Sequence, residues 1–170
     1  MYKDCGQGNS TKSGLIFEKE TSISSKLKLQ EKYKDTTEDE VICDGKVIGL
    51  LLPKYKLYKF LKSKNINWKE KLSKKLLPDE CFYNFLDNTF YIIEKKFQTK
   101  RGSVDEKLQT CEYKLKRFKK LLENISCNVK YMYLLCDWFN KDSYKDTLEY
   151  IIEKDCQFFI NELPLESIGL

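Results

Sequence analysis

One stretch, Pro78–Lys100, constrains the fold of this chain more than any other. It contains two apolar, aromatic-rich runs, Glu80–Leu86 and Thr89–Phe97, on either side of Asp87-Asn88. Asp and Asn both tolerate positive φ, and such a pair between two runs of this kind is typical of a two-residue hairpin turn. The sequence therefore predicts an antiparallel β-hairpin here.

The hairpin is expected to gather two carboxylates and a lysine at its open end. A two-residue loop pairs Leu86 with Thr89, and counting outward sets Asp79 opposite Lys96. Glu94 points to the same face as Lys96, because side chains alternate along a strand. Carboxylate oxygens suit a divalent cation, and a nearby lysine can steer a phosphate or a water. We therefore take these three charged residues as candidate catalytic groups; the alternative is a solvated ladder of charge pairs, each worth about 0.2–1 kcal/mol.

A family resemblance rests on the same residues. Pro78-Asp79, fourteen further residues and then Glu94-Lys95-Lys96 resemble the PD-(D/E)xK nuclease signature. Gly14–Glu20 and Leu51–Leu170 are also similar to small bacterial type II restriction endonucleases of that superfamily. The resemblance implies an αβββαβ restriction-endonuclease-like core and Mg²⁺-dependent hydrolysis of double-stranded DNA at a specific short sequence. It also implies a homodimer, because a two-fold symmetric DNA site presents the same bases to each subunit.

The resemblance further implies a role for each of these residues. Asp79 and Glu94 would hold Mg²⁺ together with the main-chain carbonyl of Lys95. Lys96 would orient or help to deprotonate the attacking water and stabilise the charge of the transition state. The side chain of Lys95 falls on the opposite face of the strand, so we expect Lys95→Ala to have a mild effect.

Two other polar residues are supporting candidates. Glu18 lies early in a predicted helix, Gly14–Leu29, and in the resembling nucleases a first-helix glutamate often completes the metal site. A glutamate is also simply favoured near a helix N-terminus. Gln98, one strand period beyond Lys96, could hold the water or the phosphate, or it could be a polar residue at the edge of the sheet.

Lysines gather in two segments, although the net charge of the chain is only +5. Such clusters suit a polyanion such as DNA, and the alternative is a set of ordinary solvated helix faces. The candidate DNA contacts are Lys54, Lys56, Lys100 and Arg101. The two segments contain Lys54, Lys56, Lys59, Lys62, Lys64, Lys69, Lys71, Lys74 and Lys75, and then Lys114, Lys116, Arg117, Lys119 and Lys120.

Several classes of protein are excluded by what the sequence lacks. The absence of histidine removes Ser-His-Asp and Cys-His hydrolases, histidine-ligated zinc enzymes and nucleases with a histidine base. The seven cysteines include no CxxC pair, which fits buried thiols in a reducing cytoplasm. No apolar run approaches the ~20 residues of a membrane span. Gly6–Ser13 lacks the glycine and the preceding strand of a phosphate-binding loop, so we expect no nucleotide cofactor.

The remaining patterns predict a single α/β domain over residues 1–170, with a mixed β-sheet flanked by helices. Residues 1–13 are expected to form a loose arm and residues 53–77 a helical insertion. Tyr131 and Tyr133 could stack on unpaired bases, but their apolar strand assigns them to the core. The other predicted elements are strands Val41–Cys43 and Lys46–Leu52 around the turn Asp44-Gly45, helices Lys54–Lys64 and Trp68–Leu77, a helix from Ser103 to Leu122, strand Asn128–Phe139, helix Tyr144–Lys154 and strand Cys156–Ile160.

Two other functions remain open at this point. A junction resolvase or repair nuclease would keep the catalytic residues but recognise the shape of DNA rather than a base sequence. A non-catalytic DNA-binding subunit would bind DNA whether or not Mg²⁺ is present, and its acidic hairpin would be structural.

Overall fold

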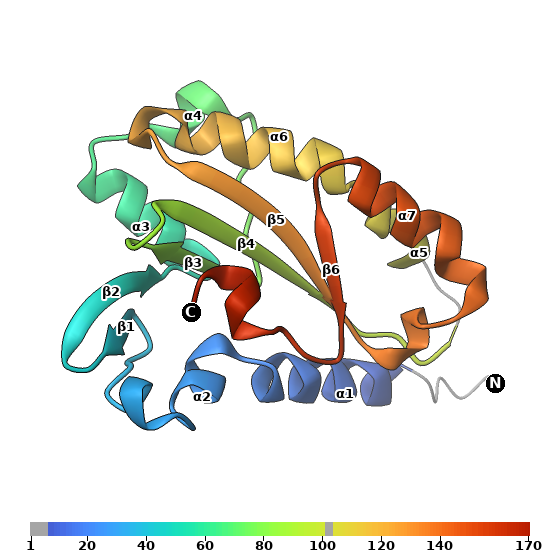
Figure 1. Ribbon diagram of the computed structural model, residues 1–170. Helices are drawn as coiled ribbons and strands as arrows, with labels where there is room; N and C mark the ends of the chain where they lie inside the picture. Colours follow the sequence, from blue (N-terminus) through green and yellow to red (C-terminus); the bar gives the residue numbers. More distant parts are fainter. Residues whose placement is uncertain (1–6, 101–103) are drawn as a thin grey trace.

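A six-stranded mixed β-sheet organises the computed structural model, which describes residues 7–100 and 104–170 (Figure 1). Its strands lie in the order of the sequence, β1 to β6. The first four pair antiparallel, and β5 and β6 extend the sheet in parallel with β4. The strands are β1 (Glu40–Cys43), β2 (Lys46–Leu51), β3 (Glu80–Asn84), β4 (Thr89–Lys96), β5 (Asn128–Leu135) and β6 (Gln157–Ile160).

Helices cover both faces of this sheet, which confirms the predicted α/β class (Figure 1). On β4, Phe90 and Ile92 face a core shared with α3, α6 and α7. Tyr91 and Ile93 face a second core, which is shared with α2 and with the C-terminal segment, residues 163–170. Alternate residues of one strand thus belong to two different layers. The helices are α1 (Gln7–Glu20), α2 (Ile23–Leu27), α3 (Tyr55–Ser63), α4 (Trp68–Lys71), α5 (Val104–Leu108), α6 (Cys111–Leu122) and α7 (Lys145–Glu153).

Several predicted helices are shorter than the apolar pattern indicated. The predicted helix Gly14–Leu29 is divided between α1 and α2, and α1 begins at Gln7, within the segment expected to be a loose arm. The predicted helix from Ser103 to Leu122 is divided between α5 and α6; the hydroxyl of Thr110 bonds to the carbonyl of Lys107 at the break. A side chain that satisfies a backbone carbonyl competes with the helix in this way. Residues 1–6 of the expected arm lie outside the described residues.

Two local predictions match the structure closely. Asp44 and Gly45 join β1 to β2 with φ of 47° and 76°, as a hairpin turn with two left-handed residues requires. Tyr131 and Tyr133 are fully buried on β5, as expected for core residues.

The hairpin of β3 and β4 forms, but its predicted register is wrong by two residues. Asn84 pairs with Thr89, and Glu80 pairs with Ile93, so the loop contains four residues instead of two. The fully buried side chain of Asn84 explains the earlier turn: its oxygen accepts from the backbone N–H of Leu86 at 2.8 Å, and its amide donates to backbone carbonyls of the C-terminal segment. A local side-chain to backbone bond therefore ends the strand before the Asp-Asn pair.

A slip of two residues preserves the faces of the strands. The next pair beyond Glu80 and Ile93 sets Asp79 opposite Glu94 rather than opposite Lys96. Because the side-chain period of a strand is two, all three side chains still share a face. The structure therefore corrects the predicted partners and keeps the predicted cluster.

Candidate functional site

Three oxygens converge on the ammonium group of Lys96 at the end of β4. Its Nζ lies 2.9 Å from Glu94 Oε2 and 3.6 Å from Asp79 Oδ2. It also donates a hydrogen bond of 3.0 Å to the main-chain carbonyl of Lys95. The two carboxylates and the carbonyl that were predicted to hold Mg²⁺ thus contact the ammonium group of Lys96 in this structure.

Asp79 reaches this point because it directly precedes β3. Its Oδ2 accepts the backbone N–H of Lys95 at 2.8 Å, which holds the carboxylate against β4. The preceding residue, Pro78, accepts the backbone N–H of Lys54 at 2.9 Å, so the chain entering the site is also fixed. The bond to the carboxylate of Asp79 is charge-assisted, and such bonds are shorter and stronger than neutral ones.

The cluster differs from the solvated ladder considered as its alternative. The side chains of Asp79, Glu94 and Lys96 are only 21%, 11% and 16% exposed. Charges buried to this extent interact in a lower effective dielectric and are less screened by salt. The cluster therefore has an electrostatic strength that an exposed ladder lacks.

Lys114 of α6 is part of the same cluster, and the sequence analysis did not place it there. Its Nζ lies 3.4 Å from Glu94 Oε2. Burial lowers the pKa of Lys114, and the negative charge of Glu94 opposes this effect. The available signal was positional: residue 114 follows Cys111 by three and precedes Phe118 by four, so this lysine occupies the apolar, inward stripe of the helix.

The side chain of Lys95 points to the opposite face, as predicted, but it is not a free control position. Its Nζ pairs with Glu80 Oε1 at 2.6 Å and donates to the carbonyl of Glu18 at 2.8 Å. Lys95 is only 2% exposed and Glu80 only 15%. Burial raises the pKa of Glu80, and Lys95 opposes that rise. The expectation of a mild Lys95→Ala variant is therefore revised, because the substitution would leave a buried carboxylate without its cation.

Glu18 lies near the C-terminal end of α1 and turns its carboxylate toward Lys54. The two charged groups are 4.0 Å apart, and both line a cavity of about 500 Å³ together with Asp79. The structure thus brings Glu18 to the cavity of Asp79, with Lys54 as its ion-pair partner. Its position two residues before the end of α1 rules out the explanation of Glu18 as a favoured helix N-terminal glutamate.

Gln98 is buried just beyond β4 rather than exposed at a sheet edge. Its backbone N–H donates to the sulfur of Cys136 at 3.3 Å, and its carbonyl accepts from the same thiol. These contacts join the end of β4 to the end of β5. The remaining role considered for Gln98, a contact with water or phosphate, stays a prediction.

The four candidate DNA contacts have different surroundings. Lys54 and Lys56 line the cavity beside Asp79, and Lys56 is held by Asp39 at 2.7 Å. Lys100 is exposed after β4, and Arg101 lies outside the described residues. Of the two lysines beside the cavity, Lys54, at 4.0 Å from Glu18, is held less closely than Lys56.

The donor set at the cluster fits Mg²⁺, although it offers few side chains. Asp79 and Glu94 provide carboxylate oxygens and Lys95 provides a carbonyl. Across residues 7–100 and 104–170, no group of three or more Cys, Asp or Glu side chains could hold a metal ion. Mg²⁺ is commonly bound by only one or two carboxylates, with waters and substrate phosphates as its other ligands.

Comparisons with protein-family models, curated proteins and solved structures give no match to this chain. Within the part of the chain that the structure describes, no helix is long and apolar enough to cross a membrane. The chemistry of the site must therefore be argued from its own residues.

Proposed function

We propose that this chain is a Mg²⁺-dependent deoxyribonuclease of the type II restriction kind, which hydrolyses double-stranded DNA at a short specific sequence. One observation carries the proposal: Asp79, Glu94 and the carbonyl of Lys95 surround the Lys96 ammonium at the end of a β-hairpin. A bound Mg²⁺ would supply Lewis-acid stabilisation of the phosphate charge.

The residues of the chain have separate tasks in this proposal. Asp79 and Glu94 would hold the cation, and the backbone N–H of Lys95 keeps the carboxylate of Asp79 in position. Lys96, as an ammonium, orients the attacking water and stabilises the negative charge that develops on the phosphate. Partial burial strengthens each of these interactions.

The order of elements supports the same family of nucleases. A helix, α1, precedes an antiparallel run of strands that ends in the β3–β4 hairpin; α6 and the parallel strand β5 follow. This order is compatible with the αβββαβ core, and the candidate residues lie on its hairpin. One order of elements can serve many functions, so the residues of the site carry the proposal.

A cleavage assay tests the proposal directly. Purified protein is incubated with unmethylated phage DNA in Mg²⁺ and, separately, in EDTA. We expect discrete DNA fragments in the reaction with Mg²⁺ and intact DNA in the reaction with EDTA. Sequencing of the fragment ends then gives the recognition sequence. Intact linear DNA together with cleavage of a four-way junction would assign the site to a structure-specific nuclease instead. DNA binding without cleavage of either substrate would favour a non-catalytic subunit.

The proposed enzyme acts as a homodimer, since two strands of a symmetric site need two active sites. Sedimentation with a duplex that contains the recognition sequence should therefore give two chains per duplex. One chain per duplex, with cleavage of both strands, would contradict this arrangement.

Lys114→Ala should slow DNA cleavage about 10- to 100-fold, because Lys114 and Glu94 form a partly buried ion pair, and roughly 1.4 kcal/mol of lost stabilisation is a tenfold change in rate. The variant removes the second ammonium that holds Glu94. Single-turnover cleavage rates at saturating protein provide the measurement.

Lys116→Ala is the matched control for this variant. Lys116 lies two residues further along α6, is 71% exposed and pairs with Glu112 one turn away. Its loss should leave the rate within a factor of two or so, since exposed pairs contribute little. Equal rates for the two variants would remove Lys114 from the site.

A further inference from the structure

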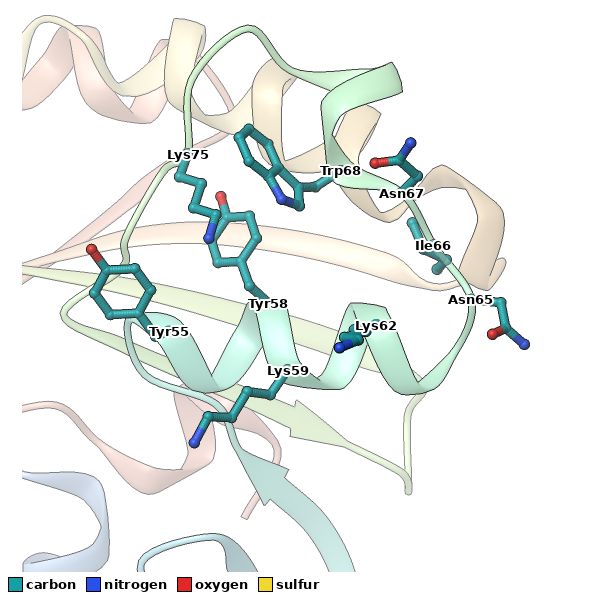
Figure 2. Close-up of a pocket in the computed structure, with 9 residues that line it drawn as sticks. All are labelled: Tyr55, Tyr58, Lys59, Lys62, Asn65, Ile66, Asn67, Trp68 and Lys75. Atoms are coloured by element: carbon teal, nitrogen blue, oxygen red, sulfur yellow. The ribbon is translucent and has the colours of Figure 1, made fainter.

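A second cavity, of about 760 Å³, is lined by α3, α4 and the segments beside them (Figure 2). Its volume falls within the range of roughly 300–1,000 Å³ that is usual for small-molecule sites. None of its lining residues belongs to the cluster around Lys96. They are Tyr55, Tyr58, Lys59, Lys62, Asn65, Ile66, Asn67, Trp68 and Lys75.

Three aromatic rings form the wall of this cavity around one lysine. The Nζ of Lys75 lies 5.3, 4.8 and 5.1 Å from the ring centroids of Tyr55, Tyr58 and Trp68, respectively. Figure 2 shows Lys75 reaching in between Tyr55 and Trp68. Tyr55 is 60% exposed and Trp68 is half-buried, so aromatic surface beside Lys75 is open to a ligand.

The charge of the cavity is of one sign. Among the described residues that line it, Lys59, Lys62 and Lys75 are cationic and none is acidic. Clustered lysines attract anions, and aromatic faces bind planar groups by stacking. A ligand that satisfies both features carries a planar base and a phosphate.

We propose that this cavity binds a nucleotide whose base is unpaired, stacked on Tyr55 and Trp68 beside Lys75, with its phosphate attracted by the lysines of the lining. A base within a duplex is already stacked on its neighbours, so such a cavity selects a base that is extrahelical or in a single strand. The inference goes beyond the proposed hydrolysis and holds whether or not the chain cleaves DNA.

The cavity and the cluster around Lys96 are joined by one short segment. Lys75 precedes Asp79 by four residues, so their Cα atoms lie at most about 14 Å apart. Tyr58 fixes this segment, because its hydroxyl donates to the carbonyl of Leu76 and accepts the N–H of the same residue, at 2.9 and 2.7 Å. A nucleotide in the cavity therefore belongs to the same stretch of nucleic acid that passes the cluster, or it acts as a free nucleotide beside it.

Fluorescence of 2-aminopurine in EDTA tests the proposal without any cleavage. The probes are a duplex with one extrahelical 2-aminopurine, the fully paired duplex of the same sequence, and the free 2-aminopurine deoxynucleoside monophosphate. We expect the extrahelical probe to bind at least tenfold more tightly than the paired duplex. Tight binding of the free monophosphate would identify a free nucleotide as the source, and binding of the extrahelical probe alone would identify nucleic acid.

Variants separate the cavity from the rest of the surface. Tyr55→Ala and Trp68→Ala should each weaken binding of the extrahelical probe roughly 5- to 150-fold, the range found for loss of one stacking side chain. Tyr113→Ala is the control, because Tyr113 is 61% exposed on α6, away from the cavity. Tyr55→Ala removes an exposed ring and keeps the test valid if Trp68→Ala does not fold. Equal affinities for Tyr55→Ala and Tyr113→Ala, or equal binding of paired and extrahelical probes, would overturn the proposal.

Discussion

Lys96→Ala should reduce Mg²⁺-dependent DNA cleavage by roughly 10²- to 10⁴-fold, the usual loss for a proton-transfer or charge-stabilising group. Lys96 contacts Glu94, Asp79 and the carbonyl of Lys95 with one ammonium, so no other lysine in the cluster can replace all of its contacts. The rate is measured in single-turnover assays, with DNA binding followed separately in EDTA. Binding is expected to change little, because the site acts on one phosphate among many contacts.

Thermal unfolding of Lys96→Ala provides an independent test of the cation site. Without the ammonium, Asp79 and Glu94 repel each other, and Mg²⁺ should restore stability by binding the folded state. We expect Mg²⁺ to raise the Tm of Lys96→Ala more than that of the wild type. The double variant Lys96→Ala with Glu94→Gln should lose this response. A Tm that does not depend on Mg²⁺, together with wild-type cleavage, would remove both the metal and the catalytic lysine from the proposal.

The hairpin shows which parts of a fold are local in origin and which are not. Two apolar, aromatic-rich runs predicted both strands, because each strand is buried on both faces of the sheet. The first strand ends at Asn84 rather than at Leu86, and the second ends at Lys96 rather than at Phe97. The turn depended on Asn84, whose amide bonds to carbonyls of Ile168 and Gly169 more than 80 residues away. The bond from the N–H of Leu86 to the Asn84 oxygen is local and ends β3 early, but these distant carbonyls hold Asn84 in its buried position. The sequence around the turn does not specify them, so the register was missed by two residues.

The candidate site was predictable to the same extent. Asp79, Glu94 and Lys96 were predicted on one face of the hairpin and lie there. Side chains alternate between the two faces of a strand, so a register error of two residues leaves each side chain on its predicted face. Lys114 was missed because it reaches the cluster from α6, whose packing over the sheet the local pattern does not specify. The pair of Glu80 and Lys95 lies within the hairpin itself; what the local pattern did not specify is the contact of this pair with α1 and α2. The aromatic cavity was missed for a similar reason. Stacking residues were sought on β5, whereas the exposed rings lie on the helical insertion.

Lys95→Ala should lower the free energy of unfolding by about 3–5 kcal/mol at neutral pH, the usual cost of leaving one member of a buried ion pair alone. The pair formed by Lys95 and Glu80 also ties two helices to the sheet. Lys95 donates to the carbonyl of Glu18 in α1, and Glu80 accepts the backbone N–H of Ile23 in α2. Lys95→Ala will therefore lose activity through unfolding, and it cannot serve as a neutral control for Lys96.

The pH dependence of this loss identifies its cause. Burial already raises the pKa of Glu80, and removal of Lys95 raises that pKa further. A carboxyl whose pKa is higher in the folded state than in the unfolded state destabilises the fold above its folded pKa; the penalty is relieved as the pH falls through that pKa. Urea unfolding should thus show a smaller difference between Lys95→Ala and the wild type at pH 5 than at pH 7. Lys95→Met with Glu80→Gln should recover most of the stability, because the uncompensated charge is gone. A double variant no more stable than Lys95→Ala, with no dependence on pH, would assign the loss to packing rather than to the buried carboxylate.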